Sequence, residues 1–239
     1  MTWRDDALRR FYDPNRGFVD GTTEFHQICA RVIPAGGRIL EIGAGPSNPT
    51  SDFLATHGGL TGLDVDPDVR NNRALTASAV FDGGAFPFPD GSFDACVSNY
   101  VLEHVARPDI HLAEVRRVLV PGGVYAIRTP NLYHYVAMVA WLTPHWFHQR
   151  VANRLRDLPA DAHDPYPTVY AMNTPRTFRN LARAADLDVA ELHMVEKEPS
   201  YGMASPLVFY PFLAYERLVN SSRVWEPLRA NIFAVLRRH

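Results

Sequence analysis

Short apolar runs and amphipathic segments take turns along most of the chain. The runs have the length and the flanking Gly, Pro and Asp residues of buried strands. Strands are therefore expected at Arg38–Ile42, Leu60–Val65, Ala77–Phe81, Phe93–Ser98, Gly123–Arg128, Leu187–Val195 and Asn231–Leu236. Helical spacing of apolar residues predicts helices at Thr22–Ile33, Pro49–Thr56, Pro67–Leu75, Ile110–Leu119 and Thr174–Ala185. This alternation predicts a parallel sheet covered by helices on both faces.

Capping residues support three of these helices. Thr22 or Thr23 is suited to cap the first helix. Asn48 and Thr174 each precede a proline, which is the pattern of an N-cap followed by the first helical position. The starts of these helices are therefore predicted together with their existence.

Three segments depart from the alternation. Residues 1–21 are polar and aromatic, and Pro14 and Gly17 break any long helix there. Residues 131–173 are rich in Tyr, Trp and His; they read as helical at first, with a break at Pro144, and then as irregular. Residues 201–228 form an apolar, aromatic insertion that suits a core helix, a dimer face or a patch for a greasy acceptor. We see no repeat and no linker, so residues 1–239 are expected to form a single domain.

The composition is that of an ordinary globular protein. Of the 239 residues 46% are hydrophobic and 21% are charged, and the formal net charge is −2. No basic run stands out, which argues against a nucleic-acid partner. Cys29 and Cys96 are too few for a disulfide framework and are interpreted as buried free thiols. The N-terminus does not resemble a secretory signal and the apolar runs are too short to span a bilayer, so we expect a cytoplasmic protein without stable membrane insertion.

The segment between the first two strands has the organisation of a nucleotide site. Gly43 and Gly45 allow the backbone to turn sharply and to approach a ligand closely. Asp64 ends the second strand, where a carboxylate can accept hydrogen bonds from both hydroxyls of a ribose. A dinucleotide and S-adenosylmethionine are both compatible with these residues.

Three further features favour S-adenosylmethionine. Asn48 and Pro49 stand where a dinucleotide site needs a third glycine for the pyrophosphate to meet the helix. Glu41 would repel phosphates but is favourable near the amino group of a methionine moiety. Asp82 ends the third strand, where a carboxylate can accept from an adenine amino group. A dehydrogenase is therefore the least favoured enzyme class.

The successive motifs of this half resemble those of class I S-adenosylmethionine-dependent methyltransferases. They are EIGAG at residues 41–45, GLD at 62–64, the acid at 82 with PFPDGSFDACVSNYVLEHV, and RRVLVPGG. More narrowly, the chain is similar to the large family with an FDxVxSNxxLEH segment after the fourth strand. The close resemblance covers residues 36–130, and Ser47 departs from it where many members have a third glycine. It implies a Rossmann-like, seven-stranded, mostly parallel sheet with an antiparallel last strand.

The resemblance also implies roles for individual residues in binding S-adenosylmethionine and its product S-adenosylhomocysteine. The methionine end would be wrapped by the glycine loop, while the ribose and adenine would be held at the ends of the second and third strands. The implied cofactor-binding residues are Glu41, Gly43, Ala44, Gly45, Asp64, Val65, Asp82, Gly83, Ser98 and Asn99. Alternatives stay open for two of them: Asp64 as a cap for Pro67–Leu75, and Asp82 as a turn former.

Candidate residues for the reaction follow the fourth and fifth strands. His104, in the LEH triplet, is either a base or a residue that positions its helix. Asn131 either contacts substrate or caps the following helix, and Tyr170 lies on a segment that could fold over the site. Residues 1–21 are expected to form an N-terminal lid, with 131–173 and 201–228 as substrate-side or packing insertions. His145, His148 and His163 invite a metal site, but their spacing is not that of a helical zinc pair, and no metal is expected.

A methyltransferase acting on a small molecule is the leading functional hypothesis. The predicted lip carries Asn, Tyr and His, which favours an oxygen of a sugar or another specialised metabolite as acceptor. Two alternatives remain: an enzyme that transfers or cyclises the aminocarboxypropyl group and releases methylthioadenosine, and a non-catalytic module that binds the cofactor. The expected assembly is a monomer or a homodimer.

Overall fold

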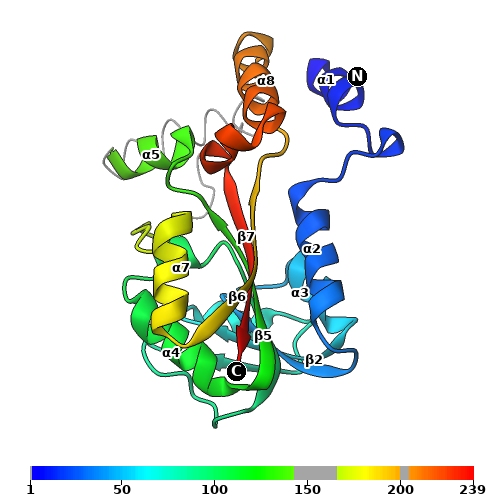
Figure 1. Ribbon diagram of the computed structural model, residues 1–239. Helices are drawn as coiled ribbons and strands as arrows, with labels where there is room; N and C mark the ends of the chain where they lie inside the picture. Colours follow the sequence, from blue (N-terminus) through cyan, green and yellow to red (C-terminus); the bar gives the residue numbers. More distant parts are fainter. Residues whose placement is uncertain (1, 143–165, 200–204) are drawn as a thin grey trace. The chain divides into compact units, whose positions relative to one another are not determined.

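A computed structural model describes residues 2–142, 166–199 and 205–239 of the chain (Figure 1). The chain divides into two compact units, which are described separately. The sheet unit comprises Phe25–Pro130, Thr168–His193 and Asn231–His239. The helical unit comprises Met1–Glu24, Asn131–Pro167 and Met194–Ala230.

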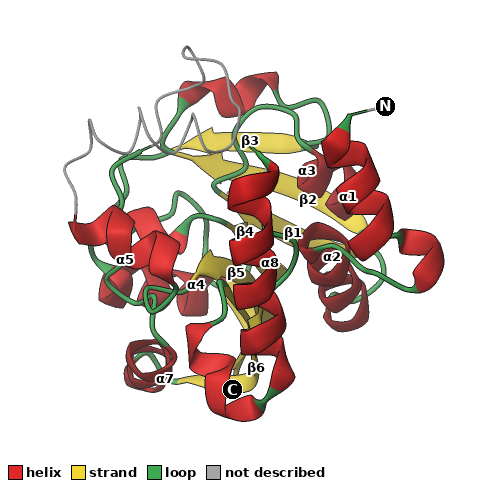
Figure 2. Cartoon of the chain, turned by 90° about the horizontal axis from the view of Figure 1, so that it is seen from above, coloured by secondary structure: helices red, strands yellow, loops and turns green. Residues whose placement is uncertain are grey.

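Seven strands form one sheet in the order β3-β2-β1-β4-β5-β7-β6 (Figure 2). The strands are β1 (Gly37–Ile42), β2 (Gly58–Asp64), β3 (Ala77–Val80), β4 (Phe93–Asn99), β5 (Leu119–Pro130), β6 (Leu187–Val195) and β7 (Asn231–Arg238). β1 pairs in parallel with β2 and β4, and β2–β3 and β4–β5 are also parallel. β7 runs antiparallel to β5. The predicted mostly parallel sheet with an antiparallel last strand is confirmed.

Helices cover both faces of this sheet. α4 (Pro108–Val118) and α7 (Pro175–Ala184) lie together on one side, and α2 (Gly21–Val32) and α3 (Pro49–Ala55) lie on the other (Figures 1 and 2). The predicted caps of α3 and α7 are present. Asn48 Oδ1 accepts from the first-turn amides of α3, and Thr174 forms a reciprocal capping box with Thr177.

Two expectations about the helices were wrong. Pro67–Leu75 contains only the short 3₁₀ turn η2 (Pro67–Asn71). The helix stops because Asn72 has extended backbone angles, which direct its amide group to the loop after β1. The cap of α2 is Asp20, because its Oδ1 accepts from the backbone amides of both threonines that were expected to cap.

The helical unit is built around an apolar contact between its first and last long helices. α1 (Trp3–Phe11), which the sequence did not predict, packs against α8 (Pro206–Ser221) through the ring of Phe209. The hydroxyl of Tyr12 donates to buried Glu216 on α8 at 3.2 Å. This unit also contains η1 (Pro14–Arg16), α5 (Tyr135–Leu142) and η5 (Arg223–Leu228).

The apolar insertion therefore supplies core side chains to the helical unit. Phe209, Leu213 and Val219 of α8 are buried, whereas Leu207 and Tyr210 are exposed. Within the described part of the chain, no helix has both the length and the apolar character needed to cross a bilayer.

Candidate functional site

The strand order reverses between β1 and β4, so the loops that follow these strands diverge at the carboxyl edge of the sheet. In open α/β sheets a ligand site lies outside the strand ends at such a point. The loop after β1 is shaped by two glycines with positive φ, +71° at Gly43 and +52° at Gly45. An added Cβ would overlap Val101 at Gly43, but it would meet nothing within 4 Å at Gly45. The backbone at Gly45 is therefore open to a ligand.

The side-chain amides of Asn48 and Asn72 donate hydrogen bonds to the backbone of the loop after β1. Asn72 Nδ2 donates to the carbonyl groups of Ala44 and Gly45 at 3.3 Å and to Ser51 Oγ at 2.9 Å. Asn48 Nδ2 donates to the Ala44 carbonyl at 2.8 Å. The sequence analysis missed Asn72, because an asparagine between two expected elements carries no signal of the loop it will reach.

Glu41 lies under the same loop and is almost fully buried. Its Oε2 accepts a hydrogen bond from Ser51 Oγ at 2.7 Å, and burial raises its pKa to about 7. The carboxyl group thus ties β1 to the first turn of α3 and so helps to order the loop between them.

The end of β2 presents a carboxylate and an apolar side chain. Asp64 Oδ2 accepts from the Gly45 amide at 2.7 Å, and Oδ1 accepts from the Asp66 amide at 2.9 Å. Each carboxylate oxygen can accept a further hydrogen bond. Asp66, rather than Asp64, caps η2. Val65 is 44% exposed, an apolar surface next to the carboxylate.

The turn after β3 is open as well. Asp82 is exposed, and its Oδ1 accepts from the Gly84 amide at 2.9 Å, which is the bond of a turn former. Gly83 has φ of +89° and no atom within 4 Å of an added Cβ. The second carboxylate oxygen of Asp82 and the backbone of Gly83 can therefore still bind a ligand.

The end of β4 places two polar side chains differently. Ser98 is fully buried, and its Oγ lies 2.8 Å from the Tyr125 hydroxyl in the core, so a ligand would meet Ser98 through its backbone. Asn99 Nδ2 donates to Thr50 Oγ1 at 3.0 Å, and this hydroxyl lies 3.3 Å from His26 Nε2. Asn99 Oδ1 is buried with no hydrogen-bond partner among the described residues. The Asn99 Oδ1 atom can therefore accept a hydrogen bond from a bound ligand.

Comparison with known proteins finds methyltransferases. A profile of the methyltransferase domain family matches residues 40–127. An uncharacterized methyltransferase of Mycobacterium sp. (strain KMS) is 32% identical over 129 residues, which cover 52% of this chain and 47% of the relative. The demethylmenaquinone methyltransferase of Tropheryma whipplei (strain Twist) is 33% identical over 97 residues, 38% of this chain and 41% of the relative.

Residues 40–127 thus resemble the methyltransferase domain family.

Solved structures agree with this domain at the level of the fold. An S-adenosylmethionine-dependent methyltransferase from Mesorhizobium loti superposes with a TM-score of 0.60 at 16% identity, over 92% of this chain and 99% of that one. The cyclase SpnF superposes with a TM-score of 0.57 at 17% identity, over 90% and 80% of the two chains. The chain spans less than half the length of the curated relatives it matches.

The site of the methyltransferase domain fits S-adenosylmethionine. The unpaired Asn99 Oδ1 suits an ammonium donor such as the methionine amino group, and the open face at Gly45 leaves room for the methionine end. Asp64 suits a diol, and exposed Val65 suits the face of a purine. These residues come from the ends of three separate strands, β1, β2 and β4, which is how this fold assembles a cofactor site.

His104 belongs to the short turn η3 (Leu102–His104), which follows β4 closely. Its Nε2 lies 3.9 Å from Glu103 Oε1, and its side chain is 28% exposed. Glu103 is buried, accepts a hydrogen bond from Thr129 Oγ1 at 3.1 Å, and has its pKa raised to about 7 by burial. An accessible imidazole thus stands beside a buried carboxyl group.

Tyr170 is joined to Glu103 by a backbone hydrogen bond. Its amide and that of Val169 donate to the Glu103 carbonyl at 3.0 and 2.6 Å, and its φ is +53°. Asn173 fixes the same segment by donating to Thr129 Oγ1 and to the Pro130 carbonyl. The structure therefore brings His104 and Tyr170 to one edge of the sheet unit.

Asn131 lies in the helical unit and is fully buried. Its Nδ2 donates to the carbonyl groups of Pro227 and Arg229 at 2.7 Å, and its Oδ1 accepts from the Tyr133 amide. These bonds hold Asn131 against the Pro227–Arg229 segment, and substrate contact and helix capping both stay predictions for it. The three histidines considered for a metal site are outside the described residues, and the residues that are described contain no cluster suited to a metal ion.

Buried carboxyl groups predict that stability falls between pH 6.5 and pH 8. The folded chain favours the neutral forms of Glu41, Glu103 and Glu196, whose pKa values are raised to about 7, 7 and 8 by burial. Their stabilising contribution is complete below the unfolded pKa near 4.5 and is lost as the pH rises through 7 to 8. Buried His111 and His134 act in the opposite sense: their pKa values are lowered to about 4, so they add stability until about pH 7.5 and offset only part of the loss.

Urea denaturation at pH 6.5 and at pH 8 measures this effect. Glu103→Gln is expected to reduce the loss of unfolding free energy between the two pH values by about 1 kcal/mol. Asp109→Asn is the control, because that exposed carboxyl group has its pKa lowered by Arg107, far below the window. An unchanged pH dependence in the Glu103 variant would contradict the raised pKa.

Proposed function

We propose that the chain transfers the methyl group of S-adenosylmethionine to an oxygen atom of a small molecule, such as a sugar or another specialised metabolite. When bound, the cofactor supplies a methyl group on a sulfonium, a leaving group that needs no acid catalysis. The chain's residues have two tasks: to hold the acceptor oxygen in line with the methyl group, and to take its proton.

The observation that carries the proposal is the place of His104. It follows β4 by a few residues, at the edge where Asn99 and the glycine loop would hold the cofactor, and its ring remains accessible. Its Nε2 is suited to accept the proton of an acceptor hydroxyl as the oxygen–carbon bond forms. The nearby Glu103 carboxyl group can stabilise the resulting imidazolium. This pair supports an oxygen acceptor over one that needs no base.

Mass spectrometry of the purified protein with S-adenosylmethionine tests the reaction type. Adenosylhomocysteine carried by the protein, and its enzyme-dependent formation with a methyl-labelled cofactor and a small-molecule extract, would support methyl transfer and reveal the acceptor. Enzyme-dependent methylthioadenosine without any acceptor would instead favour chemistry on the aminocarboxypropyl group. Binding of the cofactor with neither product would favour a non-catalytic module.

His104→Asn is expected to lower turnover of the labelled acceptor by about a hundredfold or more, since a positioned base contributes roughly 10²–10⁴ in rate. The affinity for S-adenosylmethionine should stay unchanged, because the cofactor-binding side chains lie elsewhere. Turnover and calorimetric affinity are measured on the same preparation. His193→Asn is the matched control, since His193 is an exposed histidine of β6 paired with Glu191. Full turnover in the His104 variant would exclude His104 as the base.

A further inference from the structure

The loop between β3 and β4 carries the residues assigned to adenine, yet it has no regular secondary structure from residue 81 to residue 92. Glycines with positive φ stand near both ends, Gly83 at +89° and Gly91 at +62°. A loop of this kind samples many conformations unless other parts of the protein hold it. Its conformation therefore has to be imposed from outside.

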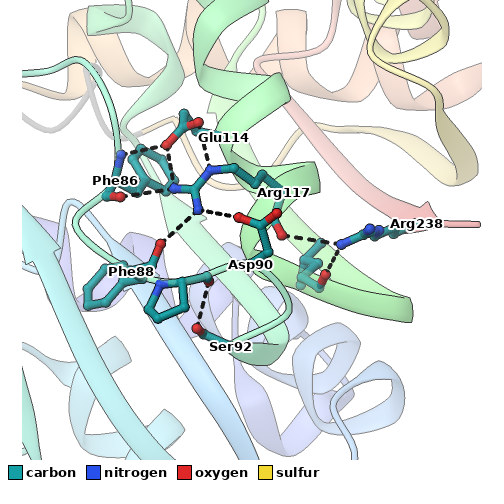
Figure 3. A network of polar contacts seen from close by, with 9 residues as sticks. Phe86, Phe88, Asp90, Ser92, Glu114, Arg117 and Arg238 are labelled. Atoms are coloured by element: carbon teal, nitrogen blue, oxygen red, sulfur yellow. Dashed lines mark hydrogen bonds and ion pairs between the residues drawn. The ribbon is translucent and has the colours of Figure 1, made fainter.

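Buried Phe86 packs against Phe81 and His111, and one guanidinium group makes most of the polar contacts that hold the loop (Figure 3). Arg117 on α4 has five N–H donors, and all five make hydrogen bonds. Nη1 donates to the Phe88 carbonyl and to Asp90 Oδ1, at 2.7 and 2.8 Å. Nη2 donates to the Phe86 carbonyl at 2.9 Å and to Glu114 Oε2 at 2.7 Å, and Nε donates to Glu114 Oε1 at 2.9 Å. Three of these five acceptors belong to the loop.

Arg117 and Glu114, with their bonds to the loop, are called the clamp here, and backbone groups add to it. The Phe86 amide donates to Glu114 Oε2 at 2.6 Å, so Phe86 is held through both its amide and its carbonyl group. The Gly91 amide donates to the carbonyl oxygen of Arg117 itself at 3.0 Å. Arg238 of β7 donates to the same carbonyl and to that of Leu119. The backbone that carries Arg117 is therefore tied to strand β7 of the sheet.

The segment held by Arg117 is separated by only a short stretch of chain from the turn at Asp82 and Gly83, which is assigned to adenine. The turn at Asp82 and Gly83 is fixed on one side by the Phe81 amide, which donates to the Asp64 carbonyl at 3.0 Å. On the other side only Gly84 and Ala85 separate it from Phe86. Fixing both ends of so short a turn leaves its carboxylate and backbone few other positions.

We propose that Arg117 is a positioning residue for recognition of the adenine base: its five bonds hold the loop so that Asp82 and the Gly83 backbone face the exocyclic amino group. This inference rests on the proposed cofactor site. Holding the loop in advance removes the entropy cost of ordering it when the cofactor binds. The gain is specific to the base, because the ribose and methionine contacts belong to other loops.

The test compares two ligands that differ at the exocyclic group. Calorimetry gives the affinities for S-adenosylhomocysteine and for S-inosylhomocysteine, in which a carbonyl oxygen replaces the adenine amino group and the adjacent N1 becomes a donor. Asp82 can accept from the amino group but is repelled by the carbonyl, so the unsubstituted chain should prefer the adenine ligand by about tenfold or more. Arg117→Met, of similar length but without donors, should weaken adenosylhomocysteine binding about tenfold and leave inosylhomocysteine binding nearly unchanged.

Arg116→Met is the matched control, since Arg116 is the neighbouring residue on α4 and makes an ion pair with Asp186 away from the loop. If Arg117→Met folds poorly, Arg117→Lys, which keeps the charge but loses the planar fork, should show a smaller fall in preference. A preserved preference in the folded Arg117 variants, or an equal fall in affinity for both ligands, would overturn the inference while the cofactor site stands. Failure of the unsubstituted chain to bind adenosylhomocysteine would overturn the proposed cofactor site and the inference with it.

Discussion

Asp64→Ala is expected to weaken the binding of S-adenosylmethionine by more than about a hundredfold. Two hydrogen bonds from ribose hydroxyls to a carboxylate contribute about 1.5–3 kcal/mol each, and about 1.4 kcal/mol corresponds to a factor of ten. The substitution also removes the acceptor of the Gly45 amide at 2.7 Å, which holds the glycine loop against β2. The loss therefore combines a missing ligand contact with a loosened loop.

Asp64→Asn separates these two contributions. The amide oxygen of asparagine can still accept from the Gly45 backbone, but the side chain has lost its charge and one acceptor. Its affinity is expected to lie between those of the unsubstituted chain and the alanine variant. Asp68→Ala is the control, since that carboxylate lies on η2 and contacts only its own turn. Calorimetric titration measures all three, and unchanged affinity in Asp64→Ala would show that the ribose is held elsewhere.

Gly43→Ala is expected to destabilise the fold by about 2–5 kcal/mol. The positive φ of +71° costs an alanine about 1–2 kcal/mol, and the new Cβ would overlap Val101 Cγ2, which adds an overpacking cost of about 1–3 kcal/mol. Val101 directly precedes the turn that carries Glu103 and His104, so relief of the overlap would displace the proposed base. Turnover should fall together with stability.

Two further variants test the cause. Val101→Ala combined with Gly43→Ala removes the overlapping methyl group, so the pair should be less destabilised than the sum of the single changes. Gly45→Ala shares the positive φ but meets no neighbour, so it should cost only about 1–2 kcal/mol of stability while weakening cofactor binding. Urea denaturation without ligand measures the free energy of unfolding. Equal destabilisation by the two glycine substitutions would contradict the overlap at Val101.

The local pattern of the sequence was sufficient for most of the sheet and its parallel core. Every predicted strand is present, and β6 has the predicted bounds Leu187–Val195. The caps of α3 and α7 were also predicted correctly, because Asn48 and Thr174 act on amides two or three residues away. β5 begins earlier than predicted, at Leu119, because its first pairing is with Phe93 before the irregularity in the β4–β5 register.

The tertiary structure alone decided how the candidate side chains are used. Ser98 points into the core toward Tyr125, Asn72 leaves the helical conformation to hold a loop 28 residues before it, and Asn131 bonds to carbonyl groups about 100 residues later. Each choice depends on a partner distant in sequence, and periodicity carries no signal of such a partner.

The same division applies to the site as a whole. The sequence by itself determined the strand–glycine loop–strand–acid order, since glycine conformation and a strand-end carboxylate are local properties of Gly43, Gly45 and Asp64. Only the fold decided that Glu41 lies buried beneath the loop and that Arg117 clamps the loop after β3. The physical reason is that burial and hydrogen bonding depend on which segments are in contact in the folded chain. The order of the strands in the sheet determines these contacts.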